Sequence, residues 1–154
     1  MTTFRVVHPK GHFLKRHSLS LVAGGVLSLW IVLYYFGDPK THLGAFYGNA
    51  VADWSGLFVT VVGTKFFFES HSMESREPVG HKHGPIAEFF HQHSLSIFLV
   101  ITGAGWAALY AAFDANGKWN QVVGNIVSEW TQMLGLVLMT KRLIEPGSKE
   151  SREQ

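Results

Sequence analysis

Four stretches of the chain are apolar for long enough to cross a lipid bilayer. Two of them, Ser18 to Phe36 and Ser94 to Phe113, contain no charged residue, and neither has the polar stripe at helical spacing that a surface helix of a soluble protein carries. The other two each hold one acidic residue, Asp53 or Glu129, before a lysine near the end. A helix of about 18 or more apolar residues spans the hydrocarbon core. The predicted transmembrane helices are 18–37, 46–66, 93–113 and 121–143.

The predicted fold is therefore all-α, a bundle of four transmembrane helices. The alternative is a soluble four-helix bundle, but helices that are apolar all round would leave faces with nothing to cover them. Apolar residues make up 47% of the 154 residues and aromatic residues 14%, which is high for a soluble protein of one-domain length.

Positive charge is distributed unevenly along the chain. Of the 13 Lys and Arg residues, all but Lys40 and Lys118 lie in the N-terminal tail, the stretch 65–93 or the C-terminal tail. Lys and Arg concentrate on the cytoplasmic side of membrane proteins, so both termini and the central linker are predicted to be cytoplasmic. The basic balance then indicates a face that meets the lipid bilayer, and not a nucleic-acid partner. The chain has no cysteine, which excludes thiolate catalysis and disulfides.

The second half of the chain repeats the first without a gap. A shift of 76 positions brings residue 17 onto residue 93 and aligns "HSLS" with "HSLS". The register holds through loops and polar tails, which chance similarity between two apolar helices would not produce, so we interpret the chain as a tandem duplication. Identical aligned pairs include Trp30 and Trp106, Tyr34 and Tyr110, Asp38 and Asp114, Gly48 and Gly124, Asn49 and Asn125, Lys65 and Lys141, and Glu69 and Glu145.

Each repeat reads as helix, short loop, helix and tail. Because two spans return the chain to its starting side, both hairpins are predicted to enter the membrane in the same orientation, related by a pseudo-twofold axis along the membrane normal. The predicted regions are a cytoplasmic tail at 1–16, a first membrane hairpin at 17–77, a His-rich cytoplasmic linker at 78–92, and a second membrane hairpin with its tail at 93–154.

The order "SLS", "SEW.Q" and "GS.ES" resembles an uncharacterised bacterial family of small two-helix membrane proteins, a domain of unknown function. In the first repeat Asp53 replaces the acid of this motif and Gly56 replaces its glutamine. The resemblance implies one hairpin per repeat and a place in the bacterial cytoplasmic (inner) membrane, and it brings no activity with it. The second repeat carries the motif through Ser94, Leu95, Ser96, Ser128, Glu129, Trp130, Gln132, Gly147, Ser148, Glu150 and Ser151.

Each acid-bearing segment has a polar seam, because its polar residues recur at the spacing of one helix face. A charged side chain near the bilayer centre costs roughly 2.5–3.5 kcal/mol on insertion scales, so both seams are expected to face the bundle interior or a water-filled cavity. There the two carboxylates would approach each other. They would form either a cation or proton site or a hydrogen-bonded packing contact between helices. The seam residues are Asn49, Asp53 and Thr60, and Asn125, Glu129 and Gln132.

Histidines form a second candidate site, because all of them except His42 fall on the predicted cytoplasmic side. Neutral imidazole suits Zn, Cu, Ni or Fe, so a divalent metal is one interpretation, and a solvated, pH-sensitive face is the other. The sequence requires no cofactor. The candidate metal ligands are His81, His83, His91 and His93.

The sequence shows no catalytic motif, such as a phosphate-binding glycine loop or a nucleophile elbow, so we do not expect an enzyme. The expected function is that of a structural or accessory subunit, associated with copies of itself or with a larger membrane complex. The alternatives are a cation or proton conduit through the carboxylate pair and metal binding by histidines at the cytoplasmic face.

Overall fold

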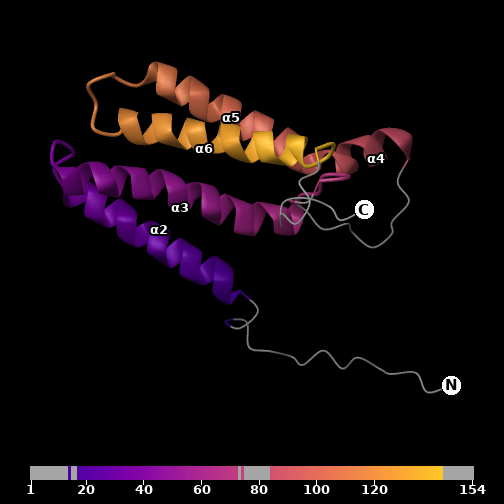
Figure 1. The fold of residues 1–154 in the computed structure, drawn as a ribbon, viewed down its shortest axis with the longest axis horizontal. Helices are drawn as coiled ribbons and strands as arrows, with labels where there is room; N and C mark the ends of the chain where they lie inside the picture. The colour runs from indigo at the N-terminus through magenta and orange to yellow at the C-terminus, as the bar shows by residue number, and fades with distance from the viewer. Residues whose placement is uncertain (1–13, 15–16, 73, 75–83, 144–154) are drawn as a thin grey trace.

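The computed structural model describes residues 14, 17–72, 74 and 84–143. Within these residues the fold is all-α, with five helices (Figure 1). They are α2 (Ser18–Phe36), α3 (His42–Phe66), α4 (Pro85–Gln92), α5 (Ser94–Ala112) and α6 (Asn120–Met139).

The four long helices form two antiparallel hairpins that point the same way. Helices α2 and α3 form the first hairpin and α5 and α6 the second, and both connecting loops lie at the same end of the molecule (Figure 1). We call this end the loop end. The opposite end is the basic end, because Lys65 at the end of α3 and Lys141 just after α6 lie there.

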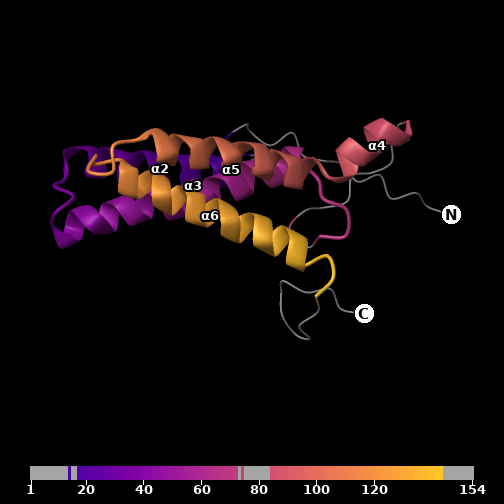
Figure 2. The ribbon, with the colours of Figure 1, turned by 90° about the horizontal axis from the view of Figure 1, so that it is seen from above.

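The long helices pack as a row. Contacts run from α2 to α3, from α3 to α6 and from α6 to α5, so that α3 and α6 occupy the centre of the row (Figure 1). Seen from above, α2 lies behind α5 (Figure 2). The centre of the molecule is therefore a contact between the second helix of each hairpin.

Equivalent turns join the helices of each hairpin. The Asp38 carboxylate accepts a hydrogen bond from the backbone N–H two residues later at 2.9 Å, and Asp114 makes the same contact at 3.0 Å. Such Asx turns favour a sharp reversal of the chain. Thr41 then caps α3 by accepting from the N–H of Gly44 at 3.1 Å. Position 44 requires glycine, because a Cβ atom would collide with the carbonyl oxygen of Asp38.

The prediction of four transmembrane helices is wrong. Among the described residues, only α2, α5 and α6 are long and apolar enough to cross a membrane. These three helices indicate a membrane protein. The predicted bundle of four spans is replaced by a row of four long helices, of which three are apolar enough to span.

The difference lies in the composition of α3, which has 25 residues but falls short in hydropathy. It carries His42 and Asp53, and most of its buried residues are small. Small residues allow close approach of neighbouring helices, but they contribute little hydropathy. The small residues of α3 suit its close packing between α2 and α6, and its low hydropathy follows from them and from its polar residues. The small buried residues are Gly44, Gly48, Ala50, Ala52, Gly56 and Gly63.

The expected His-rich linker, 78–92, contains a further helix. Helix α4 covers its second half and starts with Pro85, a residue favoured in the first turn because it lacks an N–H to satisfy. Residues 78–83 lie outside the described part of the chain. Ile86, Phe89 and Phe90 are exposed on α4, and the helix ends at His93, directly before α5.

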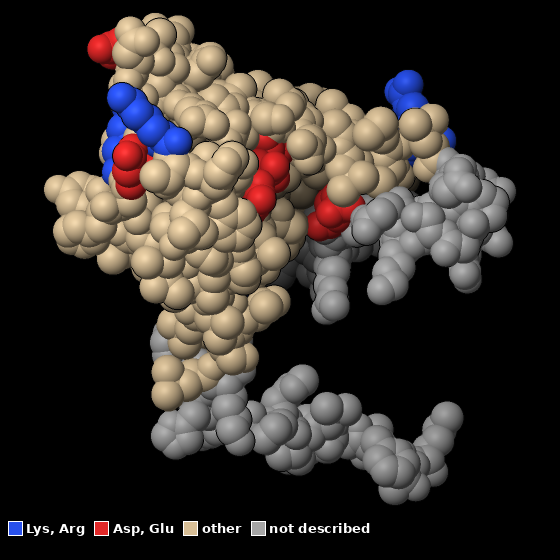
Figure 3. All heavy atoms as spheres, turned by 60° about the vertical axis from the view of Figure 1, so that its left-hand side comes forward, with Lys and Arg blue, Asp and Glu red and all other residues tan. Residues whose placement is uncertain are grey.

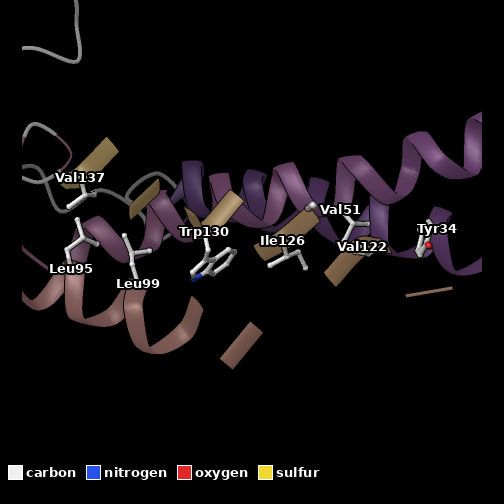
Figure 4. Close-up of a cluster of buried hydrophobic side chains, with 9 residues drawn as sticks. Tyr34, Val51, Leu95, Leu99, Val122, Ile126, Trp130 and Val137 are labelled. Carbon is white, nitrogen blue, oxygen red and sulfur yellow. The ribbon is translucent and has the colours of Figure 1, made fainter. Parts of the chain in front are cut away.

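A narrow apolar core follows the row of helices from one end to the other (Figure 4). At the loop end Tyr34 and Val122 are buried, and at the basic end Leu95 packs close to Val137. Trp130 lies between these ends and donates its indole N–H to Thr102 Oγ1 at 2.8 Å, which satisfies the polar atom of a buried side chain. The core residues are Tyr34, Val51, Ala52, Leu95, Leu99, Val122, Ile126, Trp130 and Val137.

Candidate functional site

Polar side chains meet where α3 packs against α6. Asn125 Nδ2 donates a hydrogen bond to Asn49 Oδ1 at 2.6 Å. These two residues occupy equivalent positions in the two hairpins, 76 residues apart, so the helices meet in matched register. The structure therefore brings the two predicted asparagines of the seams together.

The two acidic residues lie one helical turn further along the same faces. Asp53 is exposed, and Glu129 is half-buried. Glu129 rests on Gly56 of α3, where a Cβ atom would lie 3.1 Å from its Oε2 atom. Gly56, which aligns with Gln132 of the second hairpin, thus makes room for the Glu129 side chain.

The remaining two predicted seam residues are Thr60 and Gln132. Thr60 Oγ1 donates to the Gly56 carbonyl oxygen of its own helix at 3.0 Å and lies 3.3 Å from the Met133 sulfur. Gln132 is exposed. We therefore define the polar strip as Asn49, Asp53, Asn125 and Glu129.

The polar strip is not enclosed, contrary to the expectation that the seams face the interior. Asn49 and Asp53 are exposed, while Asn125 and Glu129 are half-buried. Figure 3 shows acidic atoms on a broad surface that is mostly uncharged. In the described part of the chain α2 packs on α3 and α5 packs on α6, and the face of the α3–α6 contact that carries Asn49 and Asp53 stays exposed. The cavity beside Thr60 and Thr64, about 190 Å³ in volume, has an otherwise largely apolar lining.

A second polar cluster lies at the basic end around Glu69, whose side chain is 0% exposed. Its Oε1 atom accepts hydrogen bonds from His93 Nδ1 at 2.7 Å and from Lys141 Nζ. Its Oε2 atom accepts from the backbone N–H of Ser96 at 3.0 Å. A carboxylate that follows the first hairpin thus accepts hydrogen bonds from three groups of the second. We call these four residues the Glu69 cluster.

Residues before and after Glu69 also form hydrogen bonds with the second hairpin. The N–H of Phe68 donates to Ser94 Oγ at 2.8 Å, and the N–H of Leu95 donates back to the Phe68 carbonyl oxygen at 3.0 Å. Ser72 Oγ lies 3.1 Å from Thr140 Oγ1, and both residues are buried. The Glu69 cluster is therefore a fixed contact between the hairpins.

The Glu69 cluster favours the ionised carboxylate. Burial raises the pKa of Glu69, because it removes water from the charge, but hydrogen bonds from His93, Lys141 and Ser96 act in the opposite direction. The hydrogen bonds prevail, so the pKa of Glu69 lies below its ordinary value of 4.5.

The loop end has its own contact between the hairpins. Lys118 Nζ donates to the carbonyl oxygens of Tyr35 at 2.9 Å and Gly37 at 2.5 Å. These carbonyls lie at the C-terminal end of α2, where a positive charge is favourable because the helix dipole is negative there. The Tyr34 hydroxyl donates to the Lys118 carbonyl oxygen, and the Tyr34 ring packs edge-on against Trp119, with centroids 4.9 Å apart.

The candidate metal ligands do not assemble in the described part of the chain. His81 and His83 lie outside the described residues. His93 contacts Glu69, as described above, and the ring of His91 lies beside that of Phe68, with centroids 6.1 Å apart. Among the residues that the structure describes, no group of three or more His, Asp or Glu side chains could hold a metal ion.

Sequence reasoning missed the contacts that Glu69, Tyr34 and Lys118 make between the hairpins. One signal for Glu69 was present, because Thr64, Lys65 and Glu69 recur as Thr140, Lys141 and Glu145. A polar pattern that recurs at the end of an apolar helix indicates a specific contact there. Lys118 has no such signal, because its equivalent in the first repeat is His42.

Comparisons with known proteins identify no relative. No protein-family model, no curated protein and no solved structure matches the chain. The resemblance to the family of two-helix membrane proteins therefore stays a prediction.

Proposed function

We propose that this chain is a membrane-embedded structural subunit that associates with copies of itself through the polar strip. The observation that carries the proposal is the position of the polar strip on the central helices, where Asn49 and Asp53 are exposed and Asn125 and Glu129 are half-buried. The three apolar helices support a membrane location. We propose no catalytic reaction.

The energetic argument rests on the cost of polar groups in lipid. A carboxylate exposed at the bilayer centre costs roughly 2.5–3.5 kcal/mol on insertion scales, and such residues normally face a protein interior or water. Covering the strip with a second copy removes the carboxylates from lipid and supplies amide donors from the partner's asparagines. Interhelical hydrogen bonds of this kind contribute about 0.6–2 kcal/mol each.

The orientation and origin of the subunit belong to the same proposal. The sequence repeat supports a tandem duplication, and α2 and α5, which have the same length and occupy equivalent positions, agree with it. The two hairpins point the same way, so Lys65 and Lys141 lie at one end. We propose that this basic end faces the cytoplasm of a bacterium, with the protein in the inner membrane.

Native mass spectrometry in mild detergent tests the proposed association. The wild-type protein is expected as a defined multimer, and a variant with leucine at all four positions of the polar strip is expected as a monomer that remains helical. The matched control is Thr131→Val, which removes an exposed polar group of α6 roughly 200° around the helix from Glu129. A wild-type monomer, or multimers that persist in the leucine variant, would contradict the proposal.

A cation or proton conduit is the second candidate function. The observation that favours it is that the faces carrying Asp53 and Glu129 meet, with Asn49 bonded to Asn125 and Glu129 resting on Gly56, because a cation or a shared proton relieves repulsion between two nearby acids. Asp53→Asn with Glu129→Gln keeps hydrogen-bonding groups but removes the charge. Proteoliposomes with wild-type protein are then expected to pass cations or protons faster than those with the double variant, at equal thermal stability. Flux equal to that of protein-free vesicles would exclude the conduit.

A further inference from the structure

Helix α4 exposes its apolar face and not its polar one in the described part of the chain. Ile86, Phe89 and Phe90 are 75%, 57% and 57% exposed, and their spacing of three and four residues places them on one face of the helix. Glu88 and Gln92 fall on the opposite face and are half-buried. A helix that lies between a protein and water has the reverse arrangement, with its apolar face inward.

Contacts at the basic end hold α4 in this orientation. The Gln92 side chain donates from Nε2 to Glu88 Oε1 at 2.8 Å, which pairs the polar groups along one face. The backbone N–H of Ser70 donates to the Gln92 carbonyl oxygen at 2.7 Å, and the His91 ring lies beside Phe68. The half-buried side of α4 therefore faces the segment that follows α3, and the apolar face points outward.

The apolar face lies next to the start of a helix that can cross a membrane. Helix α5 has 19 residues, which at 1.5 Å per residue is about 28 Å, close to a hydrocarbon core of about 30 Å. It begins at Ser94, directly after His93 and α4. Figures 1 and 2 show α4 at the basic end, beyond the ends of α3 and α6.

The distance along the chain places the phenylalanines at the depth of the lipid headgroups. Phe90 precedes Ser94 by four residues, so it lies about 6 Å from the start of α5 at the rise of a helix. The headgroup layer on each side of the hydrocarbon core is about 5–8 Å thick. Phe90 therefore stays within this layer whether α4 continues the direction of α5 or bends toward the membrane plane.

We propose that α4 is an interfacial helix, whose apolar face of Ile86, Phe89 and Phe90 inserts at the boundary between headgroups and acyl chains of the bilayer that α5 crosses. Amphipathic helices with Phe or Leu on one face bind lipid in this way. Lys65 and Arg142, both exposed at the basic end, suit contact with anionic headgroups.

The first hairpin supports lipid as the occupant. Leu14 aligns with Phe90 at the shift of 76 positions and also precedes its long helix by four residues. It is 65% exposed, and Phe66 at the end of α3 is 69% exposed. Large exposed apolar side chains thus recur at the basic end of both hairpins. Lipid surrounds this whole end, whereas a protein partner of α4 would require them only on α4.

Spin labelling in liposomes of phosphatidylcholine and phosphatidylglycerol tests the placement, because the chain has no cysteine of its own. A nitroxide at Phe90→Cys is expected to collide more with oxygen, which partitions into lipid, than with a water-soluble nickel chelate. Gly84→Cys, directly before α4 in open space, is the control and should show the opposite preference. Nickel access at Phe90→Cys equal to the control, or a label shielded from both reagents as by a protein partner, would overturn the proposal.

A label at Ile101→Cys, on the exposed surface of α5, separates this proposal from the membrane location on which it rests. Oxygen preference is expected there as well. Oxygen preference at Ile101→Cys together with nickel preference at Phe90→Cys would overturn the interfacial helix alone. Nickel preference at both positions would show in addition that α5 does not cross the bilayer.

Amide hydrogen exchange in the same liposomes gives an independent readout. Phe89→Ser with Phe90→Ser is expected to speed exchange of the α4 amides by roughly tenfold or more, because two large apolar groups lose their burial in lipid, while α5 and α6 exchange as in wild type. Phe89→Leu with Phe90→Leu is the control, because it keeps the apolar face but removes the ring contacts of Phe89 with Phe90 and His93. Unchanged exchange in the serine variant, or equally fast exchange in the leucine variant, would overturn the proposal.

Discussion

The two hairpins place the same tyrosine in different surroundings. Tyr34 of the first hairpin is 1% exposed and donates its hydroxyl to the second hairpin, whereas Tyr110, its equivalent, is 46% exposed. Both tyrosines nevertheless lie over an equivalent glycine of the next helix, Gly48 or Gly124. Both hairpins thus share the contact between a tyrosine and a glycine. Only Tyr34 is part of the core, because the second hairpin packs against it.

The described contacts between the hairpins are also asymmetric at both ends. The first hairpin contributes Tyr34 at the loop end, and Glu69 directly follows it at the basic end, where it is 0% exposed. The second hairpin receives both, through Lys118 and through His93 with Lys141. Two hairpins of similar sequence can therefore place residues at matched positions in different roles. The following predictions test this difference.

The largest expected difference is between Tyr34→Ala and Tyr110→Ala. Truncating the buried ring leaves a cavity beside Trp119 and Val122, and large-to-small core substitutions of aromatic residues cost about 3–5 kcal/mol. The exposed ring of Tyr110 should cost less than about 1 kcal/mol. Chemical or thermal unfolding in one detergent measures both variants. Similar losses would show that the two hairpins are equivalent after all.

Lys141→Ala should destabilise the protein by about 3 kcal/mol at neutral pH, because it removes one partner of a buried ion pair and leaves the Glu69 charge undercompensated. Lys40→Ala, at an exposed lysine of the loop end, is the control and should change stability by less than about 0.5 kcal/mol. Unfolding in detergent at neutral pH measures both. Equal effects of the two substitutions would mean that the Glu69 cluster adds nothing to the contact between the hairpins.

Gly48→Ala and Gly124→Ala test the same difference at the glycines that contact the two tyrosines. A Cβ at position 48 would lie 3.0 Å from the buried Tyr34 ring and 3.4 Å from Val122, so the substitution should cost about 2 kcal/mol through overpacking. At position 124 the Cβ would lie 2.9 Å from the ring of Tyr110, which is exposed and can move aside. Gly124→Ala should therefore change stability by less than about 0.5 kcal/mol, as the same unfolding measurement would show. A larger loss for Gly124→Ala would reverse the assignment of buried and exposed rings.

The smallest expected effect is the pH dependence of the Glu69 cluster. Because the folded-state pKa of Glu69 lies below 4.5, its ionised form stabilises the fold fully above that value, and this contribution is lost as pH falls through the folded-state pKa. The unfolding midpoint of wild type should therefore exceed that of Glu69→Gln at neutral pH, and the difference should shrink in acid. A difference that is constant with pH would show that Glu69 acts through shape and not through charge.

The sequence predicted the local hairpins better than their assembly. Uncharged apolar runs indicate α2 and α5, and helical spacing places Asn49 and Asn125 on the helix faces of Asp53 and Glu129. The row arrangement could not be predicted, because hydropathy does not specify which faces of the helices meet. A single charge before Lys65 predicts α3 as a span, but its many glycines and alanines contribute little hydropathy and serve close packing.

The polar strip shows the same limit within the candidate site. Helical spacing places Asn49 with Asp53, and Asn125 with Glu129, on common faces, and the structure keeps each pair together. Whether such a face is inside or outside depends on helix order, which the sequence pattern does not contain. Glu69 was missed because its partners His93 and Lys141 are far along the chain and come together only when the second hairpin packs against the first.

Single-cysteine crosslinking in native membranes tests most directly whether the polar strip faces another copy of the chain. Asn49→Cys places one thiol in the strip, and Val32→Cys places one on the exposed surface of α2; no other cysteine is present. Oxidation is expected to give a covalent dimer with Asn49→Cys and only monomer with Val32→Cys. Monomer at both positions, or equal dimer formation at both, would contradict self-association through the strip.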